Sequence, residues 1–401
     1  MLLLLACTDP AIEASGPPAP VVAPVDGPAD APIEGLSDAW SERYDDGYDA
    51  FDTIFRTGSG LGPTYINMAC VACHAGAERG PGVVTKMVVM DGDAPAADQS
   101  ALPWGPTERP RVAGGGETPI SVPTDVANLL VTERVGPAVY GRGYLEAVAD
   151  DEIERVEAEQ AAAGIVSGRI NRLAWSGVEA DSAFHDWIAG DTGLIGRFGV
   201  KARIVTLDEF AADALQGDMA ITSPMRPTEL PNPDGLDDDS HDGVDTTLEV
   251  VNRMADFTRL LAIPPRPVGI EAGEGDAAVG HARFAEVGCA ECHVPSLRTR
   301  ADYPVEPLAD IDAWVYTDLL LHDLGTAMAD GQADGTALSG EWRTAPLIGL
   351  SHHATFLHDG RADSIVEAIA AHGGEADAAR EAFEQLPSDE QAALAGFVLA
   401  L

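Results

Sequence analysis

The sequence predicts a mainly α-helical protein with two helical domains, of which the N-terminal one is enlarged by irregular insertions. Three observations support this prediction. The pattern Cys-X-X-Cys-His occurs twice, at 70–74 and 289–293. Several segments place apolar residues at helical spacing. Three prolines fall within the four residues 264–267, between the two motifs, and proline ends helices.

The domain organisation follows from these signals. A chain of 401 residues has room for two or three domains. Residues 1–35 are rich in Pro, Ala and acidic side chains and predict a lipoprotein-type signal followed by a disordered linker. The N-terminal domain is then expected over 36–265 and the C-terminal domain over 266–401.

The expected elements run in order along the chain. Residues 83–90, VVTKMVVM, are strand-like, and 91–125 are rich in Pro and Gly and read as irregular. A helix should enter the second motif, because Val279, Ala282 and Val287 follow helical spacing and Gly288 can end the helix. Further helices are predicted at 144–162, 207–216 and 246–261.

The charge of the chain excludes one class of function. Acidic residues number 66 and basic residues 24, which gives a formal charge of −42. A nucleic-acid-binding protein needs basic surface, so that class is excluded. Two compatible explanations remain: adaptation to a salty or high-GC host, or an acidic surface that attracts a basic redox partner.

The Cys-X-X-Cys-His motifs have three chemical interpretations. Two Cys pairs could bind zinc, and one pair could act as a redox dithiol, but neither needs the histidine. Covalent c-type haem attachment needs both features: the thiols form thioethers and the histidine binds the iron. The sequence therefore predicts two covalently bound c-type haems in cytochrome c-like domains. The tethers are Cys70, Cys73, Cys289 and Cys292, and the proximal iron ligands are His74 and His293.

The sixth ligand of each iron decides what the haem can do. A histidine or methionine there favours electron transfer, whereas an open position lets a substrate bind. For the C-terminal haem the preferred ligand is His372, which shares one face of a predicted helix with Ile365 and Ile369. The helix should begin at Asp363 or Ser364. The alternative is a histidine that only interacts with the helix C-terminus.

Two further residues compete with His372. His358, in the segment FLHDGR, is the second candidate ligand; it could instead stabilise a turn or contact a haem propionate, with Arg361 pairing a propionate. Met328 is the third candidate, although most methionines are core residues.

The N-terminal haem has no such obvious partner. After His74 the next histidine is His185, and Met87 and Met90 read as packing residues of the strand-like segment. This scarcity suggests an open iron site. Peroxide chemistry at such a site needs a group that moves a proton. The sequence does not decide among the candidates Glu108, Glu117, Glu133 and His185.

Location and a further metal site are also predicted. Haem attachment of this type implies export, and Leu4-Leu5-Ala6-Cys7 resembles a lipobox, so Cys7 is a candidate lipid anchor in the periplasm. The leader is short and lacks basic residues, which suggests that the true start lies upstream. Calcium could bind the acidic segment 231–245, although its spacing does not match an EF-hand. The alternative is a solvated loop. The acidic side chains are Asp237, Asp239, Asp242 and Asp245.

Several segments beyond the motifs resemble a known family, the bacterial di-haem oxidoreductases, described as peroxidases or thiol oxidoreductases and related to di-haem cytochrome c peroxidases. These segments are GLGPTYINMACVACH, GRFGVKA, GDMAIT, YTDLLLHDLGTAMADG, EWRTAPLIGL and FLHDGRADSIVEAIAAHGGEA. The resemblance covers residues 36–401. It departs from the usual pattern at Val200 and at 65–67. In the related peroxidases the sixth ligand of the C-terminal haem follows the HDG turn, which implies His372 here.

The expected function is therefore that of a periplasmic, lipid-anchored, peroxidase-like di-haem oxidoreductase. The C-terminal haem should relay electrons to a catalytic N-terminal haem that reduces hydrogen peroxide or a related oxidant. The electron donor should be a small redox protein, a cytochrome c or a cupredoxin. One alternative is a pure electron-transfer cytochrome. Another is a haem enzyme that oxidises thiols or side chains of a partner protein, and a third is a non-enzymatic metal module.

Overall fold

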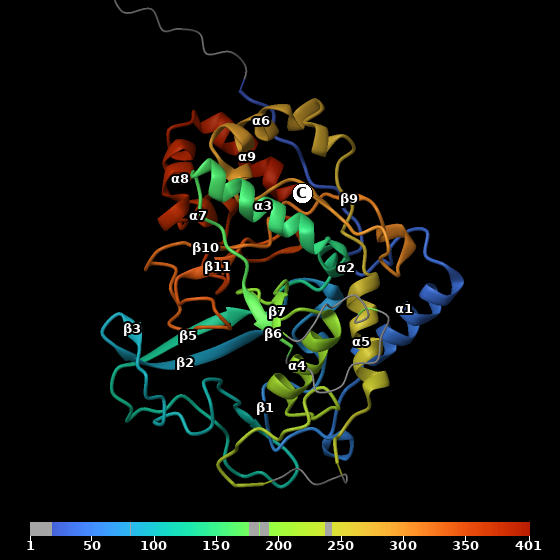
Figure 1. Cartoon of the computed structure of the whole chain (residues 1–401), viewed down its shortest axis with the longest axis vertical. Coiled ribbons are helices and arrows are strands. Elements are labelled where there is room, and N and C mark those ends of the chain that lie inside the picture. The colour runs from blue at the N-terminus through green and yellow to red at the C-terminus, as the bar shows by residue number, and fades with distance from the viewer. Residues whose placement is uncertain (1–17, 81, 176–183, 185–191, 237–242) are drawn as a thin grey trace, which may run out of the picture.

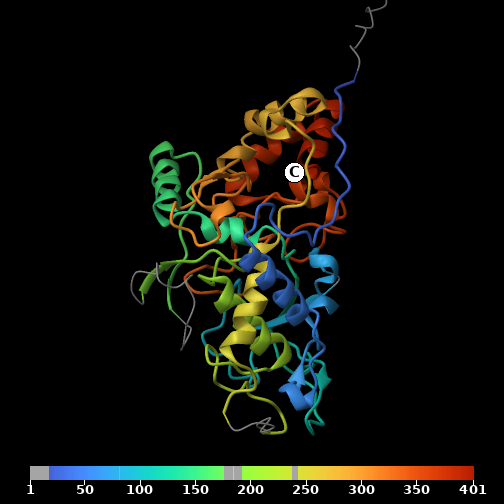
Figure 2. The same cartoon turned by 90° about the vertical axis from the view of Figure 1, so that its right-hand side faces the viewer.

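The computed structural model describes residues 18–80, 82–175, 184, 192–236 and 243–401. Helices make up 34% and strands 15% of the chain. The helices of the C-terminal part lie at one end of the molecule, and most helices and sheets of the N-terminal half lie toward the other (Figures 1 and 2). Helix exceeds strand, but the small antiparallel sheets give the N-terminal half more strand than a mainly α-helical protein has.

Three helices build the helical part of the N-terminal half. They are α1 (Asp38–Phe51), α4 (Leu207–Met219) and α5 (Leu248–Leu260). Helix α5 packs against both others, as Figure 1 shows. Its close approach to α1 needs Gly47, because a Cβ there would lie 2.5 Å from the Arg253 carbonyl oxygen. The predicted helices at 207–216 and 246–261 are confirmed.

Two helices connect this half to the C-terminal helices. The helix predicted over 144–162 is split into α2 (Arg142–Ala147) and α3 (Asp150–Ala163). Helix α3 crosses in front of the C-terminal helices in Figure 1. The Gln160 side-chain amide on α3 donates 2.8 Å hydrogen bonds to Glu291 O and Asp318 Oδ2. A helix from the N-terminal half therefore contacts the second Cys-X-X-Cys-His motif directly.

The strands of the N-terminal half form three antiparallel sheets. The largest has the order β3-β2-β5, with Val83 opposite Val135 at one end. Strand β2 confirms the strand-like reading of 83–90. The strands are β1 (Thr64–Tyr65) paired with β4 (Arg111–Val112), β2 (Val83–Asp91) with β3 (Ala94–Pro95) and β5 (Leu129–Val135), and β6 (Arg172–Ala174) with β7 (Thr192–Ile195).

The C-terminal part encloses its own apolar core, which includes Phe284, Leu394 and Phe397. Helices α6 and α9 pack closely, since a Cβ at Gly280 would lie 2.3 Å from the Ala393 carbonyl oxygen. The elements are α6 (Ala278–Glu286), β8 (Leu297–Arg298), β9 (Asp312–Ala313), β10 (Leu321–Asp323), β11 (Glu341–Arg343), α7 (Ile365–Ala370), α8 (Asp377–Glu384) and α9 (Ser388–Leu399).

The segment before α1 differs from its prediction. A disordered linker was expected through residue 35, but residues 18–35 lie extended against the body, with Val22 and Ile33 buried. The Ile33 amide donates to Leu260 O at 2.8 Å. Apolar side chains within this Pro-rich segment supply the contacts that hold it. Within the described residues, no helix is long and apolar enough to cross a membrane.

Candidate haem sites

The second motif lies at the end of α6, where Gly288 turns the chain with φ of 92°. The helix predicted to enter the motif is therefore confirmed, and the turn starts the short 3-10 helix Cys289–Glu291. The His293 ring is fixed by a 3.1 Å hydrogen bond between Nδ1 and Tyr316 O. A carbonyl can only accept, so Nδ1 carries the proton and Nε2 keeps a free lone pair. This is the tautomer that an iron ligand needs.

His372 lies directly after α7 and is fixed in the same way. The helix is N-capped by Ser364, whose side chain accepts from the Glu367 amide. His372 Nδ1 lies 2.7 Å from Ala368 O, which leaves its Nε2 free as well. Burial lowers the pKa of His293 to about 4 and also lowers that of His372, so both rings are neutral at pH 7.

One cavity of ≈ 470 Å³ has both histidines and the two cysteines of the motif in its wall. Its volume lies within the range of cofactor pockets, roughly 300–1,000 Å³. The donor set and the volume fit a c-type haem held by Cys289 and Cys292, with His293 and His372 as iron ligands. The remaining wall is mostly apolar and includes Phe284, Leu347, Ile365, Ile369 and Leu394.

The other sequence candidates near this haem have different positions. Met328 is buried in the cavity wall. His358 also lines the cavity, and its ring stacks on Trp342 at 3.7 Å between centroids. Arg361, the predicted propionate partner, does not line the cavity; it pairs with Asp359 at 2.5 Å and leaves 44% of its side chain exposed. Its assignment to a propionate therefore gains no support from the structure.

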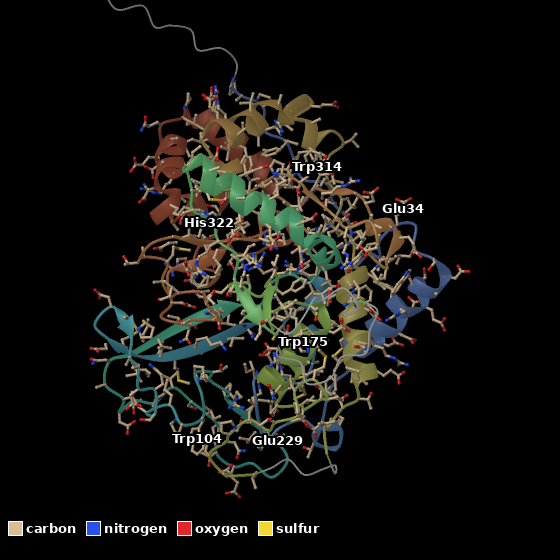
Figure 3. All side chains as sticks on the ribbon, in the orientation of Figure 1. Glu34, Trp104, Trp175, Glu229, Trp314 and His322 are labelled. Carbon is tan, nitrogen blue, oxygen red and sulfur yellow. The ribbon has the colours of Figure 1, made fainter. Side chains whose placement is uncertain are left out.

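His322, which the sequence analysis did not single out, lies beside Cys292. Its Nε2 contacts Asp318 at 2.8 Å and its Nδ1 contacts Glu375 at 3.0 Å. Burial opposes its charge, but the Asp318 carboxylate raises the pKa of His322 to about 11. Cys292, Asp318 and His322 have donor atoms within 4.8 Å of one another, as a metal site would. Figure 3 labels His322 in this region.

The first motif forms the short 3-10 helix Cys70–Ala72, and His74 follows it in the core of the N-terminal half. Burial lowers the pKa of His74 to about 4, so it too is neutral and able to bind iron. Its Nδ1 is buried and has no hydrogen-bond partner among the described residues. Gly136 lies against the ring, since a Cβ there would be 2.9 Å from His74 Cε1. The donor set again fits a c-type haem.

The segment 135–139 lies in space between the chain that follows the first motif and the cavity of the second. On one side, the Gly136 amide donates to Gly82 O and the Val139 amide to Ala77 O, both at 3.0 Å. On the other side, the Val135 amide donates to His358 O at 2.8 Å. The segment therefore contacts the chain after the first motif and a wall residue of the C-terminal cavity. Pro137 and Ala138 also line that cavity.

A group of charged residues beside the first motif was not predicted. Asp218, at the end of α4, accepts the Ile66 amide through its backbone oxygen at 2.6 Å. Burial raises the pKa of its carboxyl to about 6, and Lys86 only partly opposes this. Burial is the main cause that raises the pKa of the thiols Cys70 and Cys73, and the Asp218 carboxylate adds to it. Asp218 belongs to the GDMAIT segment, but no sequence signal linked it to residue 70.

The sequence candidates for a proton-moving group that lie within the described residues are exposed or half-buried carboxyls. Glu117 and Glu133 are exposed, Glu108 is half-buried, and His185 lies outside the described residues. The Met90 sulfur packs against Gly331, consistent with the packing interpretation. Asp245 accepts hydrogen bonds from Thr222. The other three calcium candidates, Asp237, Asp239 and Asp242, and the candidate lipid anchor Cys7 also lie outside the described residues.

Two Cys-X-X-Cys-His modules, one with a second histidine across a cofactor-sized cavity, define the class of haem-binding redox proteins. The family model "Di-haem oxidoreductase, putative peroxidase" matches residues 122–401. The chain belongs to this family of di-haem oxidoreductases, and it is accordingly an enzyme that uses haem. This confirms the family resemblance read from the sequence.

Solved structures resemble the chain distantly. Hydrazine synthase from Kuenenia stuttgartiensis has 14% identity and a TM-score of 0.40, with 100% of both chains covered. A MauG-like protein associated with microbial copper homeostasis has 14% identity and a TM-score of 0.39, with 98% of this chain and 95% of that one covered. The di-haem peroxidase BthA from Burkholderia thailandensis E264 has 16% identity and a TM-score of 0.38, with 96% of this chain and 90% of that one covered. No curated protein matches the chain.

Proposed function

We propose that this chain is an exported di-haem peroxidase with one covalent c-type haem on each motif. Electrons enter at the C-terminal haem and pass to the N-terminal haem, where hydrogen peroxide is reduced. The observation that carries this proposal is the pair His293 and His372, whose Nδ1 atoms are both held by backbone carbonyls. Two fixed and neutral Nε2 atoms across one cavity suit a six-coordinate iron that transfers electrons without binding substrate.

The N-terminal site is proposed as the place of the chemistry because it combines one iron ligand with a proton-carrying group. When bound, haem iron supplies the electrons of the reaction. Reducing one peroxide molecule to two waters consumes two electrons and two protons. Asp218, with a pKa near neutral, can take a proton from the bound peroxide and return it to the leaving oxygen. Lys86 and Arg203 supply positive charge that offsets its ionised form.

The partner and the location are part of the same proposal. The net charge of −42 favours a small donor with a basic face, a cytochrome c or a cupredoxin. Covalent c-type haem requires export, and Cys7 in its lipobox-like context would anchor the chain at the periplasmic face of a membrane. Loss of peroxide turnover above about 0.5 M salt would be the signature of such electrostatic docking.

The experiment is low-temperature electron paramagnetic resonance on the ferric holoprotein with two haems per chain. We expect one high-spin and one low-spin signal, and His372→Ala should change the low-spin signal alone. Two low-spin signals in the ferric protein, followed after addition of one electron by a remaining ferric haem that is still low-spin, would instead identify a pure electron-transfer cytochrome. Slow peroxide consumption that a partner protein accelerates, with oxidation of its thiols or side chains, would identify the third function.

A further inference from the structure

Three arginines stand in the wall of the C-terminal cavity without an acidic partner. They are Arg79, Arg142 and Arg343, and they come from three separate parts of the chain. Arg343 exposes 9% of its surface, and Arg79 and Arg142 are half-buried. In the described part of the chain, no salt bridge within 4.0 Å joins any of them to a carboxylate.

Their hydrogen bonds go to backbone carbonyls. Arg343 donates to Gly199 O at 3.0 Å and Thr344 O at 3.2 Å, and Arg142 donates to Ala138 O at 2.8 Å. Arg79 donates to Leu357 O, and its buried Nε has no partner among the described residues. Carbonyl groups stabilise a guanidinium through their dipoles, but they leave its charge uncompensated.

A buried arginine elsewhere in the chain has its charge neutralised by carboxylates. Arg259 is fully buried and binds three carboxylates, those of Glu146, Asp208 and Asp256, each at 2.6 Å. The chain has 66 acidic residues against 24 basic ones, so carboxylates are available for any cation that needs one. Asp359 and Asp318 act on Arg79 and Arg343 only from beyond salt-bridge distance, and burial outweighs them. The absence of a paired carboxylate within 4.0 Å among the described residues therefore points to an anion from outside the chain.

The energetic cost supports the same conclusion. Burial lowers the pKa of Arg79 and Arg142 to about 10, and that of Arg343 to about 9. The charge of Arg142 lowers the pKa of Arg343 further. Burying an unpaired charge costs several kcal/mol, and like charges placed together add to that cost. An anion bound between them would offset both.

We propose that Arg79, Arg142 and Arg343 bind the propionate carboxylates of the C-terminal haem. The inference rests on the haem binding proposed above. A guanidinium matches a carboxylate with two parallel hydrogen bonds, and the cavity already holds the cysteines and histidines of this haem. Arg361, which the sequence suggested for this task, lies outside the cavity wall and is already paired with Asp359.

The arginines also fix which way the haem faces. Arg79 lies five residues after His74, and the charge of Arg142 lowers the pKa of His74. Propionates held by these arginines would therefore lie on the side of the cavity that is nearer to the N-terminal motif. Arg142 acts on both iron sites, whereas Arg343 belongs to the C-terminal one. Loss of either cation stabilises the ferric form and lowers the midpoint potential of the haem beside it.

The test is a spectroelectrochemical titration of the holoprotein, with haem counted from its absorption. Arg343→Gln should shift the ferric–ferrous equilibrium of the C-terminal haem about tenfold toward ferric, which is 59 mV for one electron. Arg343→Lys keeps the charge and should shift it by less. Arg142→Gln should shift the ferric–ferrous equilibrium of both haems toward ferric. The matched controls are Arg361→Gln and Arg155→Gln, whose arginines lie outside the cavity wall, are exposed and are paired with carboxylates.

Both controls should shift the equilibrium by less than about twofold. The inference is overturned if Arg343→Gln and Arg142→Gln hold two haems and behave like the controls. If Arg343→Gln loses its haem, recovery of that haem in Arg343→Lys supports the inference, and equal loss in both variants overturns it. A wild-type chain that holds no covalent haem would overturn the proposed function itself, which is a separate result.

Discussion

The two haem motifs share a sequence pattern but not an environment. In the C-terminal site, His293 and His372 each have Nδ1 held by a backbone carbonyl, and both line one cavity. In the N-terminal site, His74 Nδ1 has no partner among the described residues, and a carboxyl with a pKa near 6 lies beside the tethering cysteines. This difference is the basis of the proposal that the C-terminal site transfers electrons and the N-terminal site carries out the proton chemistry.

The largest expected effect is the loss of one covalent haem, which allows each site to be studied without the other. Cys70→Ser with Cys73→Ser, or Cys289→Ser with Cys292→Ser, removes both thioether bonds of one motif, because serine cannot form them. Each double variant should fall from two covalent haems to one, as measured by intact mass and haem absorption. The variant that keeps only the N-terminal haem should retain the high-spin signal. If it retains a low-spin signal instead, the contrast between the two sites is wrong.

The second effect tests proton transfer at the N-terminal site. Asp218→Asn should lower peroxide turnover by about 10²–10⁴-fold, the usual contribution of a general acid–base group. The low-spin signal of the C-terminal haem should not change. Glu133→Gln and Glu117→Gln, at exposed carboxylates, serve as controls and should keep full turnover. Turnover in Asp218→Asn equal to that of these controls would remove Asp218 from the reaction.

The same carboxyl predicts two pH dependences. Because burial raises its pKa to about 6, kcat/KM should rise as pH increases through 6 and the base form appears. The free energy of unfolding should change in the opposite direction and fall as pH increases. The unfolded carboxyl titrates near about 4, so the folded state holds the proton longer and loses stability as pH rises from about 4 to 6. Asp218→Asn should remove both slopes, which activity profiles and denaturation curves at several pH values can check.

The sequence predicted the chemistry of the sites better than their surroundings. Helical periodicity placed His372 on the face of Ile365 and Ile369, and the structure puts His372 in one cavity wall with the cysteines of the second motif. The haem roles of these residues stay predictions. Asp218 and the cavity arginines could not be found that way. Asp218 lies 148 residues from Cys70 in the sequence, so only the packing of α4 against the loop at residue 66 brings them together. Burial, which sets their pKa values, is likewise a property of the fold.

A smaller effect should follow from crowding His74. Gly136→Ala would place a Cβ 2.9 Å from His74 Cε1, and the ring would have to shift by a few tenths of an ångström. Overpacking of this kind costs about 1–3 kcal/mol. Denaturant unfolding should show this loss, together with a changed high-spin signal. Gly58→Ala is the matched control, since no atom lies within 4 Å of its added Cβ. Equal stability in both variants would show that the ring is not confined.

The smallest effect concerns the helix that carries His372. The Ser364 side chain caps α7 by accepting from the Glu367 amide, and Ser364→Ala should cost about 1 kcal/mol. Thr247→Ala removes the equivalent cap of α5, far from either haem ligand, and should cost a similar amount. Both variants should therefore unfold at similar denaturant concentrations.

The spectra should distinguish these two caps. Only Ser364→Ala loosens the turn that fixes Ala368 O, and through it the orientation of the His372 ring. Its low-spin signal should broaden or shift, whereas that of Thr247→Ala should match wild type. A cap lost without any spectral change would mean that the carbonyl of Ala368, and the tautomer it sets, does not hold His372 toward the iron. The contrast between a histidine Nδ1 held by a carbonyl in the C-terminal site and one without a partner among the described residues in the N-terminal site would then have to rest on His293 alone.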